Sequence, residues 1–290
     1  MAAAEPETSR ETAEAPNSRL VYRQKLATRL THWLWAFSLF FLLLSGLQIF
    51  NAHPALYLGD QSGFEFDNSV LRIGAEDRGG DTVGYTKVLG FQMETTGLLG
   101  FSGEPGALQA RAFPSWATIP SGRDLASGRV VHFFFAWLFF AALLIWLLAS
   151  AVNGHLRRDV IPGRADFRQV GRDLADHVRL RFYHRRRYGP LQKFSYALVL
   201  LGLFPLMILS GLAMSPGINA AAPFLAEILG GRQTARTLHF LGMVLIVLFF
   251  VVHIAMVVAA GPLNEMRSMI TGWYRADASD DERPSKREPK

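Results

Sequence analysis

The sequence contains no cysteine among its 290 residues. Disulfides, thiolate zinc sites, iron–sulfur clusters and covalently attached c-type haem are therefore excluded. Any metal ion in this protein must be bound by histidine, methionine or carboxylate side chains. Charged residues are missing from four long hydrophobic stretches, whereas a soluble domain of equal hydrophobicity would distribute its apolar residues at helical or strand periods.

These four uncharged stretches are long enough to cross a membrane. A helix needs about 20 apolar residues to cross about 30 Å of hydrocarbon. The stretches are Thr31–Phe50, Val130–Val152, Phe194–Leu212 and Leu238–Gly261. The sequence therefore predicts an all-α fold, an integral membrane four-helix bundle within a domain 26–274 that contacts the lipid bilayer. The polar segments 1–25 and 275–290 are expected to be disordered and cytoplasmic.

Lysine and arginine are distributed unevenly among the segments outside the predicted spans. Residues 1–30, the loop 153–193 and the tail 262–290 carry 22 of them, whereas the loops 51–129 and 213–237 carry 8. Cytoplasmic loops are enriched in lysine and arginine. Both termini are therefore expected in the cytoplasm of a bacterium, with the protein in its inner membrane. The pI near 9.8 reflects this topology, and no nucleic-acid partner is expected.

Two of the loops have distinctive patterns. The loop 51–129 carries a net charge of −3 and is expected to be a periplasmic insertion. Its glycine-rich sequence, with β-leaning pieces at 63–73 and 84–93, predicts a small lid that bears a hairpin. In the cytoplasmic loop 153–193, four apolar residues recur on one helical face: Phe167, Val170, Leu174 and Val178. This spacing predicts an amphipathic helix at the membrane interface.

Short motifs recur in the two halves of the chain. Leu44-Ser45-Gly46-Leu47 closes the first span, and Leu209-Ser210-Gly211-Leu212 closes the third. Arg129-x-x-His132 opens the second span, and Arg236-x-x-His239 opens the fourth. The recurrence indicates a two-helix unit that is used twice.

Four of the eight histidines lie at or in the spans: His32, His132, His239 and His253. An imidazole in hydrocarbon is costly unless it is paired. His239 and His253 are 14 residues apart, which is about 21 Å along one helix and on nearly the same face. His132 lies level with His239, and His32 lies on the side towards which His253 points. Two histidine pairs stacked across the bilayer are therefore predicted.

Three arginines each precede one of these histidines by three residues: Arg29, Arg129 and Arg236. Residues at this spacing share a helix face, so each guanidinium could meet a carboxylate of the group that the histidine binds. Haem has two propionates and an iron that needs two axial ligands. The pattern favours two non-covalent b-type haems with the four histidines as axial iron ligands. Ordinary flanking charge is the alternative interpretation of the arginines.

Competing interpretations of the histidines fit less well. A zinc site needs three or four ligands close together, and a proton-relay transporter normally carries Asp or Glu inside its spans. A haem-free membrane anchor or assembly subunit, whose histidines only pack helices, is the alternative function. His155 competes with His32 as the partner of His253, and His32 is preferred because Arg29 precedes it. Three further histidines are assigned to loops or the surface: His53, His177 and His184.

Several of these motifs are similar to those of a known family. They are Arg29-Leu-Thr-His32-Trp33, Leu44-Ser-Gly-Leu47, Gly128-Arg-Val-Val-His132-Phe133, Leu191-Gln192-Lys193, Gly230-Gly-Arg-Gln-Thr-Ala-Arg236-Thr-Leu-His239-Phe240 and the His239/His253 pair. Over most of residues 20–274 the chain resembles the bacterial di-haem cytochrome b membrane subunits of formate dehydrogenases, nickel–iron hydrogenases and thiosulfate reductases. The resemblance implies that His32 pairs with His253 and His132 with His239. The long loop 51–129 departs from the formate dehydrogenase and hydrogenase subunits.

The resemblance also implies a function. It suggests an electron-transfer subunit of an oxidoreductase complex, rather than a stand-alone enzyme, between the quinone pool and a periplasmic redox subunit of a respiratory chain. A molybdopterin oxidoreductase is the partner that it suggests. No side chain is expected to act as a catalytic acid, base or nucleophile, because the haem irons carry the redox step. A quinone is expected near the cytoplasmic haem, beside the basic loop and residues 188–193.

Overall fold

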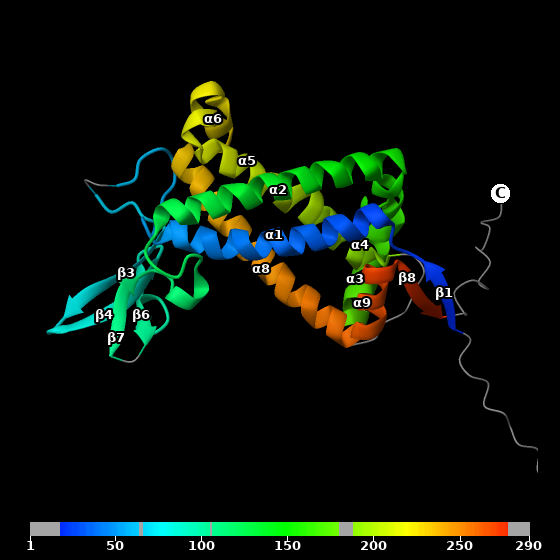
Figure 1. The fold of residues 1–290 in the computed structure, drawn as a ribbon, viewed down its shortest axis with the longest axis horizontal. Helices are drawn as coiled ribbons and strands as arrows, with labels where there is room; N and C mark the ends of the chain where they lie inside the picture. The colour runs from blue at the N-terminus through cyan, green and yellow to red at the C-terminus, as the bar shows by residue number, and fades with distance from the viewer. Residues whose placement is uncertain (1–17, 64–65, 105, 180–187, 278–290) are drawn as a thin grey trace, which may run out of the picture.

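The fold comes from a computed structural model, which describes residues 18–63, 66–104, 106–179 and 188–277. Four long helical segments run side by side (Figure 1). They are α1 (Leu26–Phe50), α2 (Leu125–Val152), a composite segment Pro190–Met214 and α8 (Arg232–Ala260). Each segment is long and apolar enough to span a membrane, which confirms the four predicted spans.

The third of these segments is not a continuous α-helix. It consists of α4 (Pro190–Ala197), the π-helical segment η3 (Leu198–Leu203) and α5 (Phe204–Met214). The π-helical turns end just before Pro205, which has no backbone N–H to donate to the preceding turn. A π-helical insertion of this kind re-registers the backbone hydrogen bonds where the regular ladder is interrupted.

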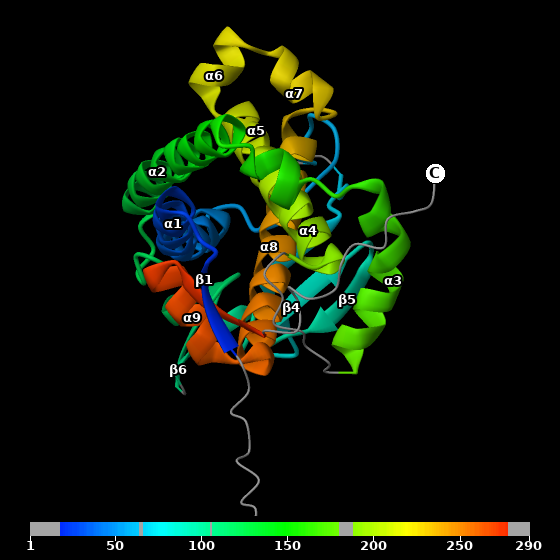
Figure 2. The same ribbon diagram turned by 90° about the vertical axis from the view of Figure 1, so that its right-hand side faces the viewer.

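The helices pack in two pairs around an aromatic core. α1 packs against α2, and α5 packs against α8, which is the arrangement that the repeated motifs predict. The Trp35 ring of α1 meets Trp146 of α2 edge-on at 5.8 Å and Phe204 of α5 at 5.6 Å. Phe139 also contacts Phe204, at 4.7 Å. These side-chain contacts join the two helix pairs, which lie side by side in the view along the bundle (Figure 2).

The prediction of an all-α fold is wrong, because the insertion 51–129 forms β-sheets. One antiparallel sheet has the order β2-β3-β4-β5, with β2 (Ala55–Leu56), β3 (Leu71–Arg78), β4 (Asp81–Val88) and β5 (Phe91–Glu94). The strands β6 (Gly100–Glu104) and β7 (Ala107–Arg111) form a hairpin, which the short helix η1 (Ser115–Ala117) follows. One physical reason lies in the β3–β4 turn, where Gly79 and Gly80 adopt φ values of 70° and 95°, which suit a tight hairpin turn.

The insertion docks on one end of the helix bundle through a second apolar core. Phe50, at the end of α1, is buried with Leu56 and Ile73 of the sheet, and Phe240 of α8 packs against them. The buried side chain of Arg111 reinforces this joint, since it donates to the Gln48 Oε1 atom of α1 at 3.2 Å. We call this the sheet end of the molecule.

The opposite end of the bundle carries α9 (Pro262–Thr271) and a small two-stranded sheet. The sheet pairs β1 (Ser18–Tyr22) with β8 (Trp273–Asp277), and we call this the α9 end. These strands include residues 18–22 and 275–277 of the segments that were expected to be disordered. Residues 1–17 and 278–290 of those segments lie outside the described residues.

The connections between the long helices are also helical. The segment η2 (Leu156–Val160) and α3 (Arg164–Val178) follow α2. The helix α3 confirms the amphipathic helix that the sequence predicts, and the side chains of Phe167, Leu174 and Val178 are exposed on it. Between the third and fourth spans lie α6 (Pro216–Ala221) and α7 (Phe224–Ile228).

Candidate functional site

The structure brings the four span histidines together in two pairs. His132 of α2 faces His239 of α8 with ring centroids 6.3 Å apart, and we call these residues the sheet-end pair. His32 of α1 faces His253 of α8, also with ring centroids 6.3 Å apart, and these form the α9-end pair. One helix, α8, therefore contributes one histidine to each pair, as the 14-residue spacing predicts.

The spacing within each pair suits a single metal ion between two imidazoles. Two rings that bind one ion from opposite sides, each at about 2.0–2.1 Å, have centroids about 6 Å apart. Among the described residues, no group of three or more histidines and carboxylates is placed to hold a metal ion. The donor set therefore fits a metal whose other ligands come from a macrocycle such as haem.

Serine hydroxyls orient both histidines of the sheet-end pair. The Ser45 Oγ atom lies 3.1 Å from His132 Nδ1, and it also lies 2.5 Å from the Phe41 carbonyl oxygen. A carbonyl oxygen only accepts, so the hydroxyl donates to it and accepts the proton of Nδ1. The Nε2 atom of His132 then keeps its lone pair for a metal ion, which is how outer groups fix a metal-binding tautomer.

The second half of the chain repeats this arrangement. Ser210 Oγ lies 3.0 Å from His239 Nδ1 and 2.6 Å from the Leu206 carbonyl oxygen. The glycine after each serine leaves room for the ring. A Cβ atom added at Gly46 would lie 3.3 Å from His132 Cε1, and one at Gly211 would lie 3.4 Å from His239 Cε1. The sequence revealed the repeated Ser-Gly motif, but its contact with the histidines was missed.

The α9-end pair has a different environment. The Nδ1 atom of His32 is buried and has no hydrogen-bond partner among the described residues. The His32 ring meets Trp33 edge-on at 5.2 Å, and the His253 ring stacks on Phe249 at 5.7 Å. The Trp33 Nε1 atom in turn donates to the Met269 carbonyl oxygen of α9 at 3.2 Å. Aromatic packing, rather than serine hydroxyls, holds these two rings.

The three predicted arginines lie near the ends of their helices and contact neutral groups. Arg29 donates to the Ile270 carbonyl oxygen at 2.6 Å. Arg236 donates to the backbone carbonyl of His53, and Arg129 lies 5.6 Å from the centroid of the Phe133 ring. Among the described residues, none of these contacts is with a carboxylate. The role of the arginines towards haem propionates stays a prediction.

His155 lies in a separate cluster at the α9 end. Its Nδ1 atom lies 2.9 Å from Asp159 Oδ2, and its ring meets Trp146 and Tyr188 edge-on, each at 6.4 Å. Burial raises the pKa of Asp159, but hydrogen bonds from Arg158 and His155 outweigh it and hold that pKa below its usual value. Burial also raises the pKa of Tyr188. The structure thus brings His253 together with His32 and gives His155 other partners.

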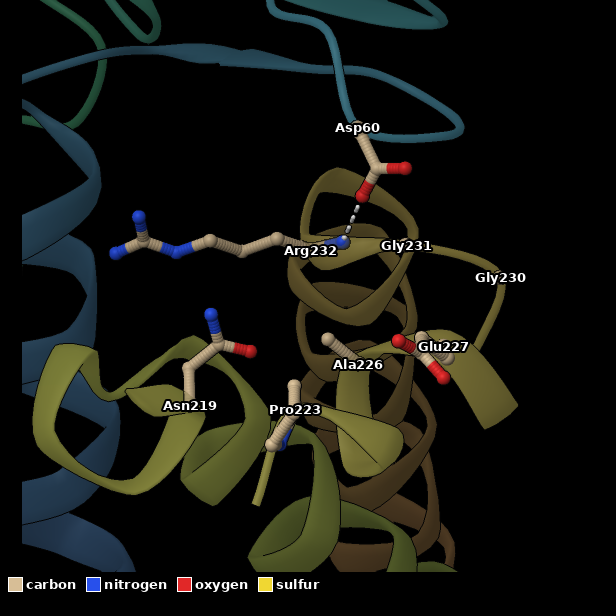
Figure 3. Close-up of a pocket in the computed structure, with 8 residues that line it drawn as sticks. All are labelled: Asp60, Asn219, Pro223, Ala226, Glu227, Gly230, Gly231 and Arg232. Carbon is tan, nitrogen blue, oxygen red and sulfur yellow. Dashed lines mark hydrogen bonds between the residues drawn. The ribbon is translucent and has the colours of Figure 1, made fainter. Parts of the chain in front are cut away.

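A pocket at the sheet end contains none of the predicted site residues (Figure 3). It is lined by Asp60, Asn219, Pro223, Ala226, Glu227, Gly230, Gly231 and Arg232. Asp60 Oδ1 accepts from the backbone N–H of Arg232 at 3.1 Å, and the Gly59 carbonyl accepts from that of Gln233 at 3.0 Å. The insertion therefore caps the first turn of α8, the helix that presents His239.

The chain matches a known protein family over most of its length. The model of the prokaryotic cytochrome b561 family matches residues 23–272, a range that includes all four paired histidines. A putative protein-methionine-sulfoxide reductase subunit YedZ1 from Azospira oryzae is 33% identical over 128 residues, which are 43% of this chain and 62% of that relative. The chain thus spans less than two thirds of the length of this relative. The family match confirms the resemblance to bacterial cytochrome b subunits, and the chain belongs to the prokaryotic cytochrome b561 family.

Proposed function

We propose that this protein is an electron-transfer subunit with two b-type haems, which connects the quinone pool to a periplasmic oxidoreductase. Membership of the cytochrome b561 family implies b-type haem binding in a multi-pass bacterial membrane protein. The observation that carries the proposal is the presence of two histidine pairs, each with ring centroids 6.3 Å apart. When bound, haem supplies one-electron oxidation and reduction at its iron.

The side chains of this protein would hold the haems and keep water away. The sheet-end pair and the α9-end pair would provide the axial ligands, with Ser45 and Ser210 orienting the former. Between the two levels lies a buried apolar layer that includes Trp35, Phe139 and Ile246. This layer would form a low-dielectric region between the two proposed haem sites.

The orientation and the partner are also part of the proposal. The split of lysine and arginine, 22 against 8, supports cytoplasmic termini and a periplasmic sheet end. The printed name of the Azospira oryzae relative makes it a subunit of a protein-methionine-sulfoxide reductase. This name supports an oxidoreductase as the partner, which would bind at the sheet end. The resemblance to di-haem cytochromes favours an oxidoreductase of the molybdopterin type.

Quinone would bind at the α9 end. The interconversion of quinone and quinol moves protons together with electrons, so its site needs titratable groups near a haem. The pair of His155 and Asp159 beside Tyr188 supplies such groups. The hydroxyl of Tyr188 donates to Gln24 Oε1 at 3.0 Å and so ties this cluster to the segment before α1.

A haem assay tests the proposal most directly. A pyridine haemochrome measurement on the purified protein should give about two haems per chain. Both should be non-covalent, because cysteine is absent. The reduced-minus-oxidised spectrum should show two b-type components that a quinol reduces. A haem content near zero would support the haem-free membrane anchor instead.

Reporter fusions test the orientation separately. Fusions after Phe50 and after Leu212 should be active only as periplasmic reporters, and a fusion at the C-terminus only as a cytoplasmic reporter. The reverse pattern would invert the assignment of the sheet end and the α9 end to the two sides of the membrane, without changing the haem content.

A further inference from the structure

The turn between β4 and β5 exposes apolar side chains. Leu89 is 73% exposed and Phe91 is 80% exposed. We call residues 88–91, Val-Leu-Gly-Phe, the apolar turn. Leu89 has a φ of 48° and Gly90 a φ of 90°. A two-residue hairpin turn with two positive φ values favours Asn, Asp or Gly at its first position, and a bulky residue there is an outlier. The turn geometry therefore does not explain why residue 89 is leucine.

The strand register places the apolar turn in one row with the base of the sheet. Phe91 pairs with Val88, Val88 with Leu71 of β3, and Leu71 with Leu56 of β2. The backbone N–H of Leu89 also donates to the Val70 carbonyl oxygen at 3.0 Å. Adjacent strands lie about 4.8 Å apart, so Leu89 lies beside the start of β3 and Phe91 lies about 10 Å to the side of it.

This row begins at the level of the membrane spans. Leu56 is buried with Phe50, the last residue of α1, and Phe240 of α8 packs against the same cluster. The Phe50 and Phe240 rings are 4.8 Å apart. Phe240 lies in the apolar part of α8, directly after His239, so the base of the sheet reaches the depth at which the spans enter lipid. The strands β4 and β5 extend sideways past α8 in the view along the bundle (Figure 2).

The charges beside the apolar turn are paired with each other. Lys87 Nζ lies 2.7 Å from Asp67 Oδ2, and Arg72 lies 3.3 Å from the other oxygen of the same carboxylate. The hydrogen bond from Lys87 holds the pKa of Asp67 below its usual range. Residues 88–91 themselves carry no charge. The turn thus presents a neutral, exposed apolar surface.

We propose that the apolar turn inserts into the lipid headgroup and acyl-chain boundary beside α8 and anchors the β-sheet insertion to the bilayer. Burial of Leu89 and Phe91 in this boundary would remove from water the two most exposed apolar side chains of the turn. A lipid occupant fits better than a protein occupant because the row is level with the spans. The anchor would fix the orientation of the sheet at the end where the proposed redox partner approaches.

Site-directed spin labelling tests this proposal, because the sequence has no cysteine and an introduced one is unique. Leu89→Cys and Phe91→Cys carry the label at the apolar turn. Asp81→Cys is the matched control, since Asp81 is the exposed first residue of β4, at the end of that strand opposite to the apolar turn. Each variant is purified, checked for the parent's elution volume and haem spectrum, and placed in phosphatidylcholine–phosphatidylglycerol nanodiscs.

The readout is the ratio of spin relaxation by oxygen, which concentrates in lipid, to relaxation by a water-soluble nickel chelate. We expect this ratio to be several-fold higher at residues 89 and 91 than at residue 81. Nickel accessibility at residues 89 and 91 equal to that at residue 81 would overturn the proposal and leave the turn free for a protein partner. The ratio does not depend on haem number or electron transfer, so it stands apart from the proposed function.

Discussion

The two histidine pairs have the same ring spacing, 6.3 Å, but different surroundings. At the sheet end, Ser45 and Ser210 fix the tautomer and orientation of both imidazoles. At the α9 end, His32 Nδ1 has no hydrogen-bond partner among the described residues, and aromatic rings hold the pair. Hydrogen-bonded ligands are more basic and better oriented. The sheet-end haem is therefore expected to be held more tightly and to have the lower midpoint potential.

Removal of the ligands should have the largest effect and should separate the two sites. His132→Ala or His239→Ala should remove the proposed sheet-end haem, because each substitution would delete one of its two proposed axial ligands. His32→Ala or His253→Ala should remove the other haem. A pyridine haemochrome assay should give about half the parent's haem for each variant, and the lost spectral component should be the same within each pair.

His155→Ala is the matched control for this experiment. It removes a histidine of the α9 end that contacts Asp159 and lies outside both pairs. Both haems should be retained. If His155→Ala lost the α9-end haem while His32→Ala kept it, the assignment of that pair would be wrong. The pairing of all four histidines by their depth in the membrane would then be wrong as well.

Substitution of the serines should have the second largest effect and should act at one end only. Ser45→Ala leaves the axial bond intact but removes the hydrogen-bond acceptor of His132 Nδ1. Loss of such a partner typically weakens metal binding by about 10- to 100-fold. The ligand also becomes less basic, so the midpoint potential of the sheet-end haem should rise. Haem retention on dilution and a spectroelectrochemical titration measure the two effects.

Ser38→Ala provides a matched control on the same helix. Ser38 is fully buried in α1, and its Oγ atom has no hydrogen-bond partner among the described residues. It lies between the two histidine levels. None of the contacts described above that orient the two histidine pairs involves Ser38. Both potentials should stay unchanged in this variant. An equal shift for Ser38→Ala and Ser45→Ala would show that helix packing, rather than ligand orientation, causes the effect.

The sequence predicted the helices and the histidine pairs because both follow from helical geometry. Uncharged runs of about 20 residues specify spans, and the 14-residue spacing of His239 and His253 specifies two levels on one face. The contacts of Ser45 and Ser210 could not be predicted in this way. They depend on the crossing of α1 with α2 and of α5 with α8, which local periodicity does not encode, although the repeated Ser-Gly motif was a usable signal.

The fold of the insertion was the main error. A glycine-rich segment such as 51–129 gives weak strand signals, since alternation is interrupted at Gly74 and Gly84 within β3 and β4. The pairing order of the strands is set by contacts with the bundle, such as those of Phe50 and Phe240 with Leu56. Long-range contacts of this kind override local propensity, so the hairpin was expected but the four-stranded sheet was not.

Substitution of the arginines should have a smaller effect on each haem. Arg29→Gln would keep the proposed axial ligands of the α9-end pair but remove a cation that we expect to contact a propionate, a contact worth about 1.5 kcal/mol. The midpoint potential of this haem should fall, because ferric haem carries one more positive charge and is then less disfavoured. Arg236→Gln should do the same at the sheet end. Potentiometric titration of both haems measures the shifts.

Arg29→Lys distinguishes charge from geometry. It keeps the positive charge but loses the planar guanidinium, so the potential should stay nearer to that of the parent than in Arg29→Gln. If Arg29→Gln shifted neither potential, the arginine would serve only as flanking charge that donates to the Ile270 carbonyl oxygen.

The smallest expected effect compares the two halves of the sheet-end site. Ala is normally favoured over Gly inside a helix by roughly 0.5–1 kcal/mol. At Gly46, however, the new Cβ atom would lie 3.3 Å from His132 Cε1, whereas at Gly211 it would lie 3.4 Å from His239 Cε1. Gly46→Ala and Gly211→Ala should therefore each displace the neighbouring ring slightly and weaken haem retention a few-fold.

Gly202→Ala is the control for this last comparison. Its Cβ atom would approach only the end of the Leu198 side chain, at 3.8 Å. Gly202 lies in the π-helical segment of the third span, and a Cβ atom added there would contact neither the His132 ring nor the His239 ring. The haem spectrum of this variant should match that of the parent. Haem retention could instead be equal after Gly46→Ala and after Gly202→Ala. The His132 ring would then have space for the added methyl group, and Ser45 alone, without the glycine beside it, would account for the tighter sheet-end site.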